Sequence, residues 1–102
     1  MSKIYVLQGS TGEYSDRTDW IVRAYKNKMD ADESCLTANQ EAADYKTARD
    51  NFEMSEAYER MPMVKVDEYY EDLVIELLSV DKEMRMDYTG TSYWVVECDL
   101  YE

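Results

Sequence analysis

The chain has 102 residues, with 23 Asp and Glu, 11 Lys and Arg and no histidine, which gives a formal net charge of −12 at pH 7. Without histidine it lacks the commonest general base and the commonest metal ligand of proteins. The acid excess disfavours nonspecific attraction to nucleic acid and favours attraction to basic protein surfaces. A chain of this length can bury one hydrophobic core, so residues 1–102 are expected to form a single domain.

The first part of the chain predicts two strands joined by a polar loop. Residues 3–8 are rich in β-branched and aromatic side chains, and residues 20–26 show the alternation of a half-buried strand. Between them lies an eleven-residue polar stretch, 9–19, which holds two of the three glycines. Gly9 and Gly12 are expected to adopt positive φ angles in this connection.

The middle of the chain predicts two helices. Asp30 followed by Glu33 forms a capping-box pattern, so the first helix is expected to begin at Asp30. Its core-facing residues are spaced three or four apart: Cys35, Ala38, Ala42, Tyr45, Arg49 and Phe52. Pro62 ends this helical stretch, because proline lacks an amide hydrogen and restricts the residue before it. Asp67 is the expected N-cap of the second helix. The apolar stripe of that helix comprises Tyr70, Leu73, Val74, Leu77 and Leu78.

A last strand is expected at residues 92–100, after a loop at 80–87. Its even-numbered positions are expected to face the core: Trp94, Val96, Cys98 and Leu100. The order ββααβ predicts an α+β fold, a three-stranded and mostly antiparallel sheet with two helices on one face. The predicted core comprises Trp20, Val22, Phe52, Leu73, Leu77, Trp94 and Val96.

No motif for covalent, nucleotide or metal chemistry is recognisable. The segment 9–12, Gly-Ser-Thr-Gly, lacks the lysine and the following helix of a phosphate-binding loop. No calcium-loop pattern is present, and the two cysteines, Cys35 and Cys98, are expected to be buried free thiols. Because 23 acidic residues offer many carboxylate pairs, no single pair indicates a hydrolase. We therefore expect no enzymatic activity, no cofactor and no bound metal.

Two polar loops, 9–19 and 88–93, are expected to lie together. If the first and last strands pair in antiparallel fashion, both loops lie at the same end of the sheet. The candidate binding residues that would converge there are Gln8, Thr11, Tyr14, Asp16, Arg17, Tyr88, Thr89 and Thr91. Two interpretations are open. Either Asp16 pairs with Arg17 and the threonines satisfy backbone groups, or the loops form a pocket for a small ligand.

The predicted helices carry a dense acidic surface, in which Glu68, Glu71 and Asp72 are the candidate binding residues. Residues 29–102 contain twenty acidic and six basic side chains, whereas residues 1–28 contain three acidic and five basic ones. This surface either binds a basic protein surface or serves solubility alone.

Two segments, 8–20 (QGSTGEYSDRTDW) and 86–94 (MDYTGTSYW), resemble a family of small hypothetical proteins of tailed bacteriophages and prophages. The resemblance implies a phage accessory protein that acts in the cytoplasm of the bacterial host, and such proteins often look like counter-defence inhibitors. It implies no catalytic residue.

Two functional hypotheses follow from these observations. In the first, the protein binds a host or phage protein and blocks a basic, nucleic-acid-binding surface without contacting nucleic acid itself. In the alternative, the two polar loops bind or sequester a small ligand. The N-terminus lacks a signal-peptide pattern and the chain lacks a long apolar run, so we expect no membrane association.

Overall fold

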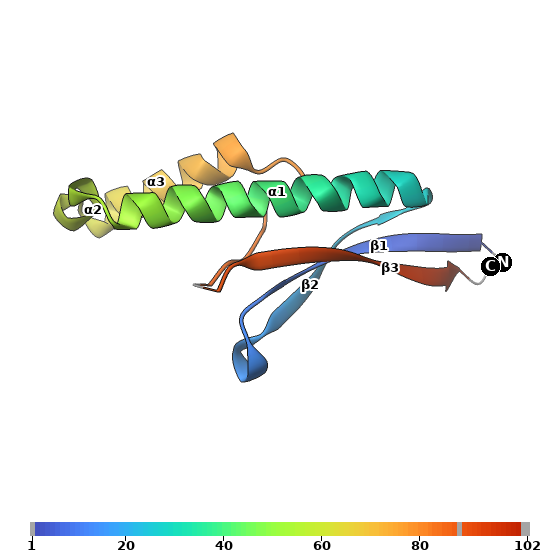
Figure 1. Ribbon diagram of the computed structural model, residues 1–102. Coiled ribbons are helices and arrows are strands. Elements are labelled where there is room, and N and C mark those ends of the chain that lie inside the picture. Colours follow the sequence, from blue (N-terminus) through green and yellow to red (C-terminus); the bar gives the residue numbers. More distant parts are fainter. Residues whose placement is uncertain (1, 88, 101–102) are drawn as a thin grey trace.

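The computed structural model describes residues 2–87 and 89–100 and shows an α+β fold (Figure 1). Its elements follow in the order β1 (Ser2–Thr11), a short 3-10 turn η1 (Tyr14–Asp16), β2 (Thr18–Tyr25), α1 (Lys28–Glu53), α2 (Glu56–Arg60), α3 (Met63–Leu77) and β3 (Thr91–Leu100). The predicted fold class is therefore confirmed, with the short α2 as an additional helix.

The sheet has the strand order β2-β1-β3, and both neighbouring pairs are antiparallel. β1 is the central strand, and it is longer than predicted because hydrogen bonding to both neighbours continues through Thr11. The first and last strands pair along their whole length, from Ser2 opposite Leu100 to Thr11 opposite Thr91. The predicted pairing of these two strands is confirmed.

Both long helices begin earlier than predicted. Asn27 is the N-cap of α1, and its side-chain oxygen accepts a hydrogen bond from the backbone N–H of Met29 at 2.8 Å. Asp30 therefore lies inside the first turn of α1. Pro62 is the N-cap of α3, where its φ of −61° suits a helix start and its carbonyl accepts from Lys65 and Val66. The proline thus begins the second long helix directly.

The three α-helices lie on one side of the sheet, where α1 runs along its face and α3 runs back beside α1 (Figure 1). The first core cluster joins α1 to the sheet through Leu7, Ala38, Ala42 and Tyr93. The alanines keep that face of α1 slim, so the helix can approach the sheet closely. A second cluster joins α3 to α1 through Tyr45, Leu73 and Leu78. The core consists of two adjoining clusters instead of the predicted single one.

The predicted orientation of β3 is wrong. Tyr93 is 6% exposed and packs in the first cluster together with Val95, whereas Trp94 and Val96 belong to neither cluster. The register explains why: Gly9 lies opposite both Trp20 and Tyr93, and directly paired residues share a face. Of the other predicted core residues, Phe52 and Leu73 are buried, whereas Trp20, Val22 and Leu77 are only half-buried.

Gly9 has a different role from the one predicted. It lies within β1, and a Cβ atom built there would stand 2.8 Å from carbons of both Trp20 and Tyr93. The bare backbone lets these two rings meet over it, edge to face, with their centroids 6.3 Å apart. Gly12 does have the predicted positive φ, +89°.

Candidate functional site

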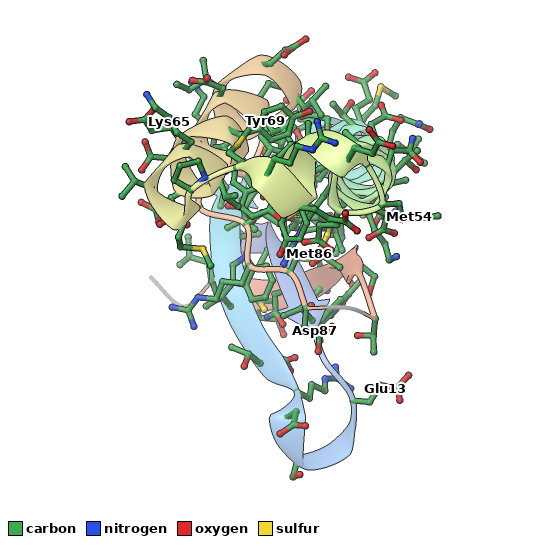
Figure 2. All side chains as sticks on the ribbon, turned by 90° about the vertical axis from the view of Figure 1, so that its left-hand side faces the viewer. Glu13, Met54, Lys65, Tyr69, Met86 and Asp87 are labelled. Atoms are coloured by element: carbon green, nitrogen blue, oxygen red, sulfur yellow. The ribbon has the colours of Figure 1, made fainter. Side chains whose placement is uncertain are left out.

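An open cleft of about 380 Å³ lies where β1 ends, β3 begins and the middle of α1 passes by. Its polar lining comes from five hydroxyl residues and from two side chains of α1: Ser10, Thr11, Thr89, Thr91, Ser92, Asn39 and Lys46. Glu13 and two glycines complete the polar rim. Figure 2 shows Asp87 between the helical layer and the β1–β2 hairpin, with Glu13 on the hairpin loop.

The two polar loops touch, as the strand pairing predicted. The Thr11 hydroxyl donates a hydrogen bond to the Gly90 carbonyl at 2.7 Å and accepts one from the backbone N–H of Asp87 at 2.9 Å. Gly90 has a φ of +93°, and a Cβ at Gly12 would collide with the Asp16 backbone. Both glycines are therefore required by the geometry of this contact.

Asp87 organises the second loop. Its carboxylate accepts hydrogen bonds from the hydroxyl of Thr89 and, at 2.8 Å, from the backbone N–H of the same residue. These bonds, with a smaller contribution from the Thr11 hydroxyl, hold the pKa of the Asp87 carboxyl below its ordinary value. The charged form of Asp87 thus favours the folded loop.

Replacing Asp87 by asparagine should lower the melting temperature near neutral pH. A carboxyl whose pKa is lower in the folded state stabilises that state above its unfolded pKa, about 3.9 for Asp. This contribution is lost as the pH falls through the folded pKa, so the difference between wild type and variant should shrink below about pH 4. Thermal unfolding across this pH range is the measurement. Glu33→Gln, which removes an exposed charge on α1, is the matched control, and a pH-independent difference would contradict the assignment.

Two predicted site residues face away from the cleft. Gln8 lies opposite Trp94 in the register, on the side of the sheet that α1 does not cover. Arg17 donates from Nε to Asp19 at 2.9 Å, and its guanidinium lies 5.8 Å from the centre of the Trp94 ring. The predicted pairing of Arg17 with Asp16 is wrong, because Arg17 and Asp19 point to the same side of the extended chain.

The remaining predicted residues are divided among different places. Thr11, Thr89 and Thr91 line the cleft, and Asp16 is exposed in η1. Tyr88 and the Tyr14 side chain lie outside the described residues. The acidic candidates do not belong to the cleft: Glu68, Glu71 and Asp72 are exposed on α3.

Asn39 and Lys46 are lining residues that sequence reasoning missed. Asn39 accepts from the backbone N–H of Tyr93 at 2.8 Å and donates to its carbonyl at 3.1 Å, which fastens α1 to β3. Lys46 pairs with Asp50 at 2.7 Å and places a positive charge beside the hydroxyl groups. Their sequence positions did indicate that they lie near the sheet. Asn39 directly follows Ala38, and Lys46 lies about one helical turn after Ala42.

Most hydroxyl groups of the cleft already have partners within the chain. Thr11 bonds to Gly90, Thr89 bonds to Asp87, and Thr91 donates to the Arg85 carbonyl. A polar ligand would therefore find the side chains of Lys46 and Glu13 as its main contacts. This pattern favours a structural role for the two loops over a preformed ligand site.

Comparison with protein-family models, curated proteins and solved structures finds no match to this chain. The resemblance of its two motif segments to phage proteins therefore stays a prediction. Among the described residues, no helix has the length and apolar character needed to cross a membrane.

Proposed function

We propose that this protein acts by binding another protein through the outer face of α3, and that its partner presents a basic surface of the kind that binds nucleic acid. The observation that carries this proposal is a single helical face formed by residues three or four apart: Val64, Glu68, Glu71, Asp72 and Ile75. All five are exposed, and the two apolar ones strongly so, Val64 at 67% and Ile75 at 76%. Carboxylates between exposed apolar side chains suit a partner of opposite charge.

Two acids of α1 bond to residues outside that helix, whereas, among the described residues, the acids on this face of α3 bond to none outside α3. On α1, the Glu41 carboxylate accepts from the backbone N–H of Ser79 at 2.9 Å, and Glu53 accepts from the Tyr70 hydroxyl at 2.6 Å. On α3, Glu68 pairs with Lys65 in an exposed contact of 3.3 Å. No ion pair among the described residues includes Glu71 or Asp72. Their charge is available to a partner.

Neutralising this face should weaken binding of the partner without unfolding the protein. The variant Glu68→Gln, Glu71→Gln, Asp72→Asn should bind roughly ten- to a hundredfold more weakly. Its melting temperature should stay level or rise, because self-repulsion falls. The measurement is capture of partners from lysate of infected bacteria at low and high salt, and added salt should weaken capture by the wild type.

A matched control removes the same amount of charge elsewhere: Glu33→Gln, Asp44→Asn, Glu83→Gln, at three exposed positions outside α3. It should leave capture unchanged. A partner that ignores both salt and the α3 variant would contradict the proposal. The second candidate function is capture of a small polar ligand in the cleft. The cleft's volume of about 380 Å³ lies within the range of ligand pockets and supports that candidate.

A further inference from the structure

One face of the sheet is apolar and carries no helix. Strand alternation and register place a mostly apolar set of side chains on the side opposite α1. We call eight of them the open face: Ile4, Val6, Gln8, Ile21, Trp94, Val96, Cys98 and Leu100. Ser10, Asp19, Ala24 and Ser92 lie on the same side. Ile21 is 70% exposed and Leu100 is 41% exposed. Figure 1 shows α1, α2 and α3 on the other side of the sheet. Apolar patches of this kind mark contact surfaces.

None of the eight side chains of the open face is charged, in a chain whose net charge is −12. Asp19 lies on this side, and Arg17 pairs with it at 2.9 Å while lying over the Trp94 ring. The acids of β3, Glu97 and Asp99, belong to the opposite alternation and contact Lys3. A neutral apolar surface fits a partner surface that is also neutral and apolar.

We propose that the occupant of the open face is the open face of a second copy, in a symmetric face-to-face dimer. Such an interface is self-complementary, because the same patch serves both copies. It also keeps the acidic helices of the two copies on opposite outer sides, where their mutual repulsion is smallest. Two stacked sheets about 10 Å apart would share a core formed by these side chains.

Pairing of two copies through the β3 edge fits the structure less well. The backbone N–H and C=O of Tyr93 on that edge are already bonded to the Asn39 side chain. The Cys35 thiol approaches the same carbonyl at 3.4 Å. With these groups bonded to α1, a strand ladder along β3 would be interrupted at Tyr93.

The area of the open face sets the expected affinity of the dimer. Three strands of up to ten residues cover about 33 Å by 14 Å, or roughly 450 Å² for each copy. A total of about 900 Å² lies below the usual size of stable complexes, so the dimer should dissociate on dilution through the micromolar range.

The test is sedimentation equilibrium of the purified full chain from about 5 to 500 µM, a span centred on that range. The wild type should pass from monomer to dimer, and added salt should strengthen the dimer by screening repulsion between two acidic chains. This salt response is opposite to the one expected of the α3 partner, so the two proposals can fail independently.

Two variants place a charge on the open face at exposed positions, Ile21→Lys and Leu100→Lys, and each should weaken dimerisation at least tenfold. Both lower the net negative charge, so weaker association could not come from increased repulsion. Ile75→Lys adds the same charge on α3, at a position 76% exposed, and should leave the dimer intact. A monomer at every concentration, a dimer insensitive to both open-face variants, or a dimer lost in Ile75→Lys would each overturn the proposal.

Discussion

Replacing Tyr93 by alanine should lower the free energy of unfolding by about 3–5 kcal/mol, the usual cost of truncating a buried aromatic side chain. Tyr93 is 6% exposed and packs against Leu7, Ala38 and Ala42. Its ring also meets Trp20 edge to face. A domain of this size has a total stability of about 5–15 kcal/mol, so the variant should unfold at far lower urea concentration. Urea unfolding followed by far-UV circular dichroism is the measurement.

The next residue provides the matched control. Trp94 has the larger ring but lies half-buried on the open face, so Trp94→Ala should cost about 1 kcal/mol, the central value for point substitutions. The comparison is between two adjacent aromatic residues of β3 that lie on opposite faces of the sheet. If Trp94→Ala proved the more destabilising change, the assignment of Tyr93 to the buried face of β3 would be wrong.

The orientation of β3 could not be predicted from its sequence, although the strand itself could. Tyr93 and Val95 are apolar on one face, and Trp94 and Val96 are apolar on the other. Alternation identifies a buried face only when the opposite face is polar. The deciding information lies in the register, which places Tyr93 opposite Gly9, 84 positions away along the chain. No local pattern encodes a pairing over that distance.

The predicted start of α1 is wrong for a related reason. Asn27 and Asp30 are both good capping residues, and the capping-box pattern at Asp30 has a stronger sequence signature. Asn27 is the N-cap because β2 ends at Tyr25, and α1 must turn back over the sheet at once. Tertiary geometry selected the cap from among several that were locally suitable.

The sequence predicts where the candidate site lies in the fold, but not all the side chains that line it. Antiparallel pairing of the first and last strands sufficed to bring the two loops together. The pattern could not reveal that Arg17 turns to the open face or that Lys46 reaches the cleft from α1. Both depend on how α1 lies across the sheet.

Asp81 is the buried acid that links the loop after α3 to the sheet. It is 9% exposed, and its Oδ2 accepts hydrogen bonds from the Trp20 indole and the Tyr93 hydroxyl, both at 2.8 Å. Its Oδ1 accepts from the backbone N–H of Glu83 at 3.2 Å. Burial, together with the bond to Asp81, raises the pKa of the Tyr93 hydroxyl far above its ordinary value. The Tyr93 hydroxyl is therefore protonated at neutral pH and donates to Asp81.

Replacing Asp81 by alanine should lower the free energy of unfolding by about 2–4 kcal/mol, because the buried Tyr93 hydroxyl and the part-buried Trp20 indole lose their acceptor together. Asp81→Asn keeps one acceptor oxygen and should cost less. Glu83→Gln removes an exposed charge two residues away and should change stability by less than about 0.5 kcal/mol. Urea unfolding of all three variants gives the ranking.

In a double-mutant cycle, Asp81→Asn should cost markedly less in a Tyr93→Phe background, where one of the two donors is already missing. Equal costs in both backgrounds would show that the Tyr93 hydroxyl and the Asp81 carboxylate contribute to stability separately, which contradicts a shared hydrogen-bond network.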